Sequence, residues 1–152
     1  MRFPQAGVSH DQSIIIDCAD LDRQAAFWAA ATGYQDAGAD GHYAVLVHPD
    51  RSQPRLLLQR VPELKTAKNR VHLDLGTDDL PAEVERLVAL GASQGQSHQE
   101  YDAIWTVLTD PEGNEFCVCA HAPTPDPRSR RTTGASAMPL LGRISAFPTG
   151  GQ

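Results

Sequence analysis

The feature of this sequence that most constrains its fold is an internal repeat. The dipeptide Asp20-Leu21 recurs as Asp79-Leu80, 59 residues later. Aspartate is a typical cap at the start of a helix, and the candidate caps are Asp20 in the first copy and Asp78 or Asp79 in the second. Each predicted helix then stops at a glycine, Gly33 in the first copy and Gly91 in the second. Two similar units in one chain predict one domain with pseudo-twofold symmetry.

Each copy is predicted to contain one helix and several strands, which makes the fold class α+β. The first copy has strand-forming runs at residues 13–18, 43–48 and 55–60, a helix at 23–32, and a weaker strand signal within 34–40. The second copy has strands at 70–75, 104–108 and 115–119 and a helix from 81 to 91, with residues 100–101 as a candidate end of one more strand. Because a helix covers only one face of its sheet, the other face must meet its twin or a ligand.

Length and composition place the chain among ordinary globular proteins with one domain. It has 152 residues, 41% of them hydrophobic, and a net charge of −6, which argues against nucleic acid as a partner. We found no apolar run of the length of a signal peptide or a membrane span. The three cysteines, Cys18, Cys117 and Cys119, have no disulfide-framework spacing and indicate a reducing cytoplasm. We expect an N-terminal arm at 1–12, a domain at 13–121 with modules at 13–61 and 69–121, and a disordered tail at 122–152.

Several side chains with binding chemistry fall on the predicted strands. His72 lies on the polar face of its strand together with Arg70 and Asp74, and Glu115 and Cys117 share one face of the last strand. His72 has three interpretations: a metal ligand, a ligand-binding or acid/base group, or a structural histidine. If His72 lay beside Cys117, it could also activate that thiol. Tyr43 and Trp105 are aromatic residues suited either to the core or to the wall of a pocket for a flat ligand.

Four segments of the chain resemble the glyoxalase-like branch of the vicinal oxygen chelate superfamily, which includes glyoxalase I, extradiol dioxygenases, and fosfomycin- and bleomycin-resistance proteins. The resemblance covers about residues 13–120, and these are the segments that carry it: Ile15-Ile16-Asp17-Cys18-Ala19-Asp20, Phe27-Trp28 with Gly33, Lys68-Asn69-Arg70-Val71-His72-Leu73-Asp74-Leu75, and Asp110-Pro111-Glu112-Gly113-Asn114-Glu115-Phe116-Cys117. It implies two βαβββ modules that form a curved, cup-like mixed sheet. It also implies a homodimer, since superfamily members often dimerise.

The resemblance further implies where a divalent metal would bind. In the metalloenzymes of the superfamily, each module offers one ligand from its first strand and one from its last. Those positions fall on Ser13, Gln59, His72 and Cys117 in this chain, with Ile15 as the alternative to Ser13. Only His72 matches the usual ligand, so the metal set is incomplete and the cofactor stays open.

Three functions therefore compete. The first is a protein that binds a small organic molecule in the cup between its modules, with ligand contacts from these residues: Gln59, His72, Asp74, Trp105, Glu115, Cys117, Tyr43 and Arg70. The second is a metal-dependent lyase, isomerase or dioxygenase whose missing ligands come from Glu115, Asp17 or His48. The third is a module that dimerises through its open sheet faces.

Overall fold

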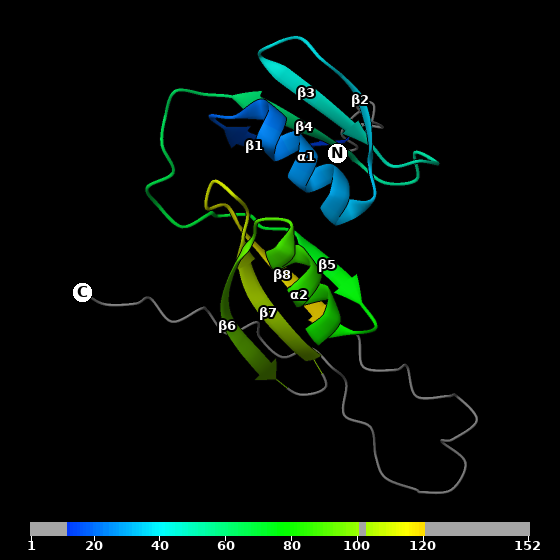
Figure 1. Cartoon of the computed structure of the whole chain (residues 1–152), viewed down its shortest axis with the longest axis vertical. Coiled ribbons are helices and arrows are strands. Elements are labelled where there is room, and N and C mark those ends of the chain that lie inside the picture. The colour runs from blue at the N-terminus through cyan, green and yellow to red at the C-terminus, as the bar shows by residue number, and fades with distance from the viewer. Residues whose placement is uncertain (1–11, 101–102, 121–152) are drawn as a thin grey trace, which may run out of the picture. The chain divides into compact units, whose positions relative to one another are not determined.

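The computed structural model describes residues 12–100 and 103–120, which form two four-stranded mixed sheets, each with one helix (Figure 1). The elements follow one another as β1 (Ser13–Cys18), α1 (Leu21–Thr32), β2 (Gln35–Ala39), β3 (Tyr43–Val47), β4 (Arg55–Arg60), β5 (Asp74–Thr77), α2 (Leu80–Ala89), β6 (Ser93–Glu100), β7 (Ala103–Thr109) and β8 (Glu115–Ala120). The predicted α+β fold of two βαβββ modules is confirmed. The N-terminal arm up to residue 11, Tyr101 and the tail predicted from 122 lie outside the described residues. Within the described part, no helix is long and apolar enough to cross a membrane.

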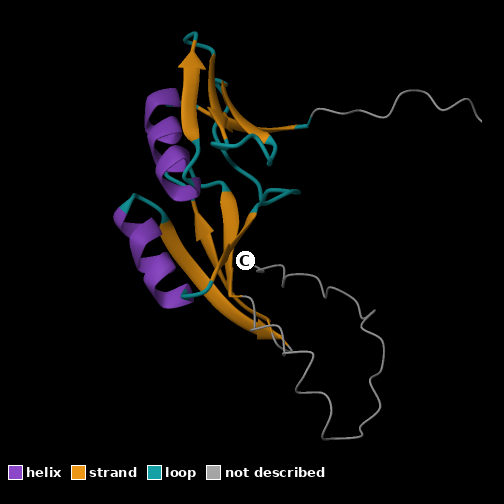
Figure 2. Ribbon diagram, turned by 90° about the vertical axis from the view of Figure 1, so that its right-hand side faces the viewer, coloured by secondary structure: helices purple, strands orange, loops and turns teal. Residues whose placement is uncertain are grey.

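The two sheets have the same strand order, as the repeat predicts. The orders are β1-β4-β3-β2 and β5-β8-β7-β6, and in each sheet the first strand runs parallel to the last while the other pairs are antiparallel. Both helices lie on the same side of the strands (Figure 2). Each sheet therefore has a helix-covered face and an open face, and the open faces carry those predicted site residues that lie within strands.

Two strands differ from the sequence prediction. β5 begins at Asp74, four residues later than predicted, and the segment before it contacts β8 through the Glu115 carboxylate, which accepts the Asn69 N–H at 3.0 Å. His72 therefore lies just before the strand and not within it. β6 was missed except for its end at Glu100, since its polar sequence carries no strand signal. It forms by pairing with β7 as an edge strand.

The first helix has the predicted caps but a different buried face. The Asp20 side chain accepts the Arg23 N–H at 3.1 Å, and Gly33 ends the helix with a left-handed φ of 73°. The sequence has an apolar stripe at helical spacing, at Ala26, Phe27, Ala30 and Ala31, which predicts the buried face. That prediction is wrong at Ala26 and Ala30, which are exposed. The buried positions are instead Leu21, Gln24, Phe27, Trp28 and Ala31.

One aromatic cluster joins the two modules into a single core. Phe27 and Trp28 of α1 meet Phe116 of β8 edge-on, with ring centroids 5.2 to 6.0 Å apart. Trp28 also donates its indole N–H to the buried Asp110 carboxylate at 3.2 Å. Trp28 is thus a core residue.

Charged side chains of the second module hold both ends of α1. The Glu112 carboxylate, in the turn between β7 and β8, accepts the N–H groups of Ala19 and Asp20, both at 2.7 Å. At the other end, the Arg86 guanidinium donates to the carbonyls of Ala30 and Ala31, both at 2.9 Å. An anion at the N-terminus and a cation at the C-terminus both suit the helix dipole.

Candidate functional site

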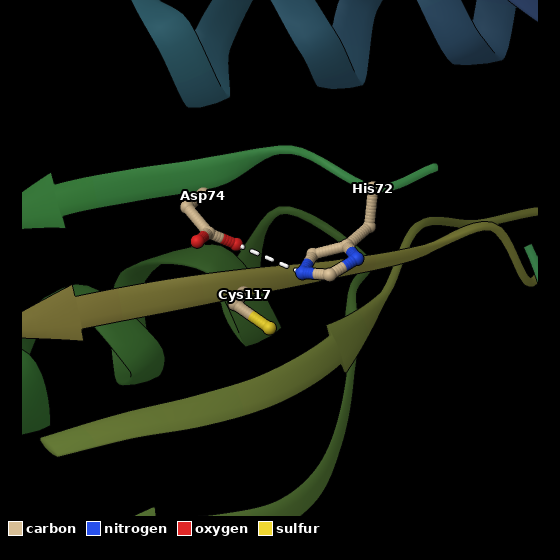
Figure 3. A group of neighbouring side chains, drawn as sticks. All are labelled: His72, Asp74 and Cys117. Carbon is tan, nitrogen blue, oxygen red and sulfur yellow. Dashed lines mark ion pairs between the residues drawn. The ribbon is translucent and has the colours of Figure 1, made fainter. Parts of the chain in front are cut away.

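Three predicted site residues come together on the open face of the second sheet. Asp74 and Cys117 are directly paired across the parallel strands β5 and β8, and His72 lies two residues before Asp74 (Figure 3). The imidazole Nε2 of His72 is 3.1 Å from Oδ1 of Asp74. One donor atom from each of the three residues lies within 4.8 Å of the other two. We call these three residues the His–Asp–Cys cluster.

The surroundings of Cys117 keep its thiol protonated. Burial is the largest cause and the Asp74 carboxylate the next, and with a thiol hydrogen bond to Asp74 they raise the pKa of Cys117 to about 12. A reactive thiolate at Cys117 therefore has no support in this environment. Cys119, on the same face, also has a raised pKa, again through burial first and Asp74 second. All three cysteines of the chain are free thiols.

Glu115 is engaged in structure close to the cluster. Its carboxylate bonds to Lys65 Nζ at 2.9 Å and accepts the Asn69 N–H at 3.0 Å. Burial opposes ionisation, but the Asn69 amide and the Lys65 ammonium together lower the pKa of Glu115. Glu115 thus fixes the segment that carries His72, and both of these contacts occupy its carboxylate.

The remaining predicted ligand-binding residues lie elsewhere on the open faces. Trp105 of β7 stacks on His98 of β6, with ring centroids 5.5 Å apart and ring planes 21° apart. Tyr43 pairs with Gln59 across β3 and β4 in the first module. Sequence reasoning missed His98 because the strand that carries it was not predicted.

A hollow of about 250 Å³ lies between the modules, bounded by β1, residues 69–73 and the start of β8. Ile14, Ile16 and Trp28 supply apolar wall, while Asn69 and Asn114 supply polar groups. Of the predicted site residues, Arg70, His72 and Glu115 line it. Tyr43, Gln59 and Trp105 are not among its lining residues.

The metal pattern that the family implies does not fit this chain. By strand register, the first-module counterparts of the directly paired Asp74 and Cys117 are Ile15 and Leu57, which are also directly paired. Neither has a ligand atom. The counterpart of His72 is Ser13, whose hydroxyl accepts the Arg55 Nε–H at 2.6 Å. A metal chelated by both modules at these positions therefore lacks donors from the first.

The alternative first-module donors are no better placed. His48 lies at the turn after β3, where its Nδ1 is 2.5 Å from the Asp50 carboxylate. Gln59 pairs with Asp17 across β4 and β1, two positions beyond the Leu57–Ile15 pair. Asp17 lines the hollow but does not join the His–Asp–Cys cluster.

Comparison with known proteins agrees with this architecture. Residues 13–119 match the model of the glyoxalase-like domain. No curated protein matches the chain in sequence. Solved structures share the fold at low identity. They include hypothetical protein SA1046 from S. aureus, with TM-score 0.62, 16% identity, and coverage of 76% of this chain and 96% of that one. A glyoxalase/bleomycin resistance protein/dioxygenase family enzyme from Burkholderia phytofirmans has TM-score 0.61 and 18% identity, and the match covers 71% of this chain and 95% of that one.

A third structure contains a metal. It is a mutant of the fosfomycin resistance protein FosX from Listeria monocytogenes, complexed with Mn(II) and 1S,2S-dihydroxypropylphosphonic acid. It has TM-score 0.63 and 15% identity, and the match covers 82% of this chain and 98% of that one. At these identities the structures show the common fold. Together with the match over residues 13–119, they show that the chain belongs to the glyoxalase-like domain family of the vicinal oxygen chelate superfamily.

Proposed function

We propose that this protein binds a small organic molecule in the hollow between its two modules, without a metal chelated by both of them. The observation that carries the proposal is the hollow itself, which combines an apolar wall with a few polar groups. Pockets of that composition are the usual binding sites for small molecules. The fold alone would not justify the proposal, because one fold supports many functions.

The size of the hollow limits the ligand. At about 250 Å³ it is smaller than the roughly 300–1,000 Å³ of pockets that enclose drug-sized molecules. A large antibiotic would contact it only in part. The proposed ligand is therefore a compact molecule whose apolar portion lies against Trp28 and Ile16, and whose polar group faces Asn69, Asn114 and His72.

His72 has a specific place in this proposal. Its side chain lines the hollow, and the ion pair or hydrogen bond between its Nε2 and Asp74 fixes the orientation of the ring. An oriented imidazole can donate a hydrogen bond to the ligand or exchange a proton with it. His72 is thus the residue we propose for any acid/base chemistry at the site.

The test is a thermal-shift screen of the full chain in buffer with a chelator, which removes any contribution of metal. The panel contains 2-oxoaldehyde thiol adducts, catechols and aromatic antibiotics. A ligand at 100 times its Kd should stabilise the fold by about 2.7 kcal/mol, which raises Tm on the order of 10 °C. The prediction is that only the compact members of the panel do so.

Two variants locate the binding. Ile15 lines the hollow and is 55% exposed, so Ile15→Trp should narrow the entrance and weaken binding at least tenfold. The matched control is Ile104→Trp, because Ile104 is 40% exposed and lies outside the lining. The proposal fails if no compound class raises Tm, or if the two tryptophan variants weaken a ligand equally.

We also propose that the protein is a cytoplasmic homodimer. Large apolar side chains at Val71 and Ile15 are exposed at the rim of the hollow, and a second copy would cover them. The three free thiols suit a reducing compartment. Sedimentation analysis should give a dimer that Val71→Glu converts to monomer; a monomeric wild-type protein would contradict the dimer.

A further inference from the structure

We infer that the His–Asp–Cys cluster is a binding site for a thiophilic divalent cation, zinc above all, built by the second module alone. This site goes beyond the proposed binding of an organic molecule. It also differs from a chelate shared by two modules, because its third ligand is Asp74 and no ligand comes from the first module.

The donor set has a definite chemical preference. An imidazole nitrogen, a carboxylate oxygen and a cysteine thiolate are the three ligand types that zinc takes in proteins. Cys117 is a protonated thiol without the ion, so it releases its proton to solvent when the cation binds. A sulfur ligand favours Zn²⁺ over Mn²⁺ or Mg²⁺, which prefer oxygen. The Mn(II) bound by the FosX structure is therefore not the ion that the cluster favours.

The geometry is close to what the ion requires. Tetrahedral zinc with bonds of about 2.0–2.3 Å places its ligand atoms about 3.3–3.8 Å apart. The Nε2–Oδ1 distance of His72 and Asp74 is already 3.1 Å, and every donor pair lies within 4.8 Å. The largest adjustment is therefore on the order of 1.5 Å, which small rotations of three side chains can supply.

The backbone holds the three residues in this arrangement. Asp74 and Cys117 face each other in the β5–β8 ladder. The Cys117 N–H also donates to the carbonyl of Leu73 at 2.8 Å, and Leu73 is the residue between His72 and Asp74. Ligands on paired strands are positioned more tightly than ligands on loops. The third ligand, His72, is anchored through Asn69 and Glu115 just before the strand.

The cluster leaves room for a fourth ligand. The side chains of His72 and Asp74 are 30% and 60% exposed, while Cys117 is buried beneath them. Three protein ligands with one open position are typical of zinc sites that accept a water molecule or substrate, whereas structural zinc sites have four protein ligands. Because His72 also lines the hollow, an ion in the cluster would lie at its edge.

The experiment titrates the purified, reduced and chelator-treated full chain with Zn²⁺, Co²⁺ and Mn²⁺. We expect one Zn²⁺ per chain, a sulfur-to-cobalt charge-transfer absorption with Co²⁺, and Mn²⁺ binding at least 100-fold weaker than Zn²⁺. Cys117→Ser and Asp74→Asn should each weaken the affinity for Zn²⁺ at least 100-fold. That exceeds the roughly 10–100-fold loss of metal affinity caused by changing a residue that contacts only the ligands.

The matched control is Cys119→Ser, which changes a cysteine on the same strand and the same face but outside the cluster. It should bind Zn²⁺ as the wild type does. Circular dichroism of each variant verifies the fold, and Asp74→Asn changes an exposed residue, so it remains informative if Cys117→Ser unfolds. Three results would overturn the inference: no cobalt–sulfur absorption, equal losses in the two cysteine variants, or Mn²⁺ binding as tight as Zn²⁺. Because the organic ligand screen contains chelator, either proposal can fail without the other.

Discussion

The carboxylate of Glu112 should make a measurable contribution to stability, although it lies in a surface turn. It accepts two backbone N–H groups at 2.7 Å, and these belong to Ala19 and Asp20 at the start of α1. Glu112→Gln removes the charge and presents an amide N–H₂ to one of the two donors. The perturbation is nearly isosteric, so packing should stay as it is.

The expected magnitude follows from these contacts. A buried hydrogen bond to a charged group is worth about 1.5–3 kcal/mol, whereas an exposed ion pair is worth about 0.2–1 kcal/mol. Both bonds of Glu112 are exposed, and the helix dipole adds about 0.3–1 kcal/mol. We therefore expect Glu112→Gln to lower the free energy of unfolding by about 1–2 kcal/mol, or Tm by roughly 4–8 °C.

Urea denaturation followed by circular dichroism measures this change. The control is Glu85→Gln, a substitution of the same chemistry on the exposed face of α2, which should change stability by less than about 0.5 kcal/mol. If Glu112→Gln and Glu85→Gln had the same unfolding midpoint, the two short hydrogen bonds would carry no net stability and the reasoning would be wrong.

Three further predictions follow from single contacts. Arg86 donates four hydrogen bonds, two to Glu83 and one each to the carbonyls of Ala30 and Ala31, which the three N–H groups of a lysine cannot all replace. Arg86→Lys should therefore lower the free energy of unfolding in urea by about 1 kcal/mol, and its effect should add to that of Glu112→Gln because the two sites lie at opposite ends of a 12-residue helix; strong non-additivity would contradict this independence. The Ser52 hydroxyl and amide, with His48, lower the pKa of Asp50 to about 2. An NMR titration should therefore find Asp50 ionised until the pH falls to about 2, and Ser52→Ala should raise the midpoint of that titration. An unchanged midpoint would show that the Ser52 hydroxyl does not stabilise the carboxylate. Burial, then Glu112, raises the pKa of Cys18 to about 11 from 9.0, so the unfolded chain loses this proton first and stability should fall between pH 9 and 11. The free energy of unfolding of Cys18→Ala should fall less between pH 9 and 11 than that of the wild type. If the two proteins lost stability equally over that range, the raised pKa of Cys18 would be wrong.

Much of the fold could be predicted because its signals are local. The caps at Asp20 and Asp79 and the stop at Gly33 act on residues within one helical turn, and all three are confirmed. β6 could not be predicted, because its polar residues form a strand only through pairing with β7. The segment before β5 is fixed by a contact between Asn69 and Glu115, which are 46 residues apart in sequence, so its course could not be predicted from local signals.

In the candidate site, too, local sequence signals could be predicted, whereas contacts between residues distant in sequence could not. The shared open face of Glu115, Cys117 and Cys119 follows from strand alternation, and the structure has Phe116 and Val118 buried on the other side. The proximity of His72, Asp74 and Cys117 needs the parallel register of β5 and β8. Strand pattern alone left the His72–Asp74 contact uncertain, since two residues on one strand are about 6.6 Å apart.

The way α1 is held has a consequence for the history of the repeat. The carboxylate and guanidinium that satisfy its two ends, and the Phe116 ring against its side, all come from the other copy. A polypeptide containing residues 13–61 alone would leave Trp28 facing water, so a half-length ancestor would have required a second molecule of itself. A duplication that joined two such partners covalently would account for these contacts, and divergence of the two copies would leave donor side chains such as Asp74 and Cys117 opposite hydrocarbon at Ile15 and Leu57.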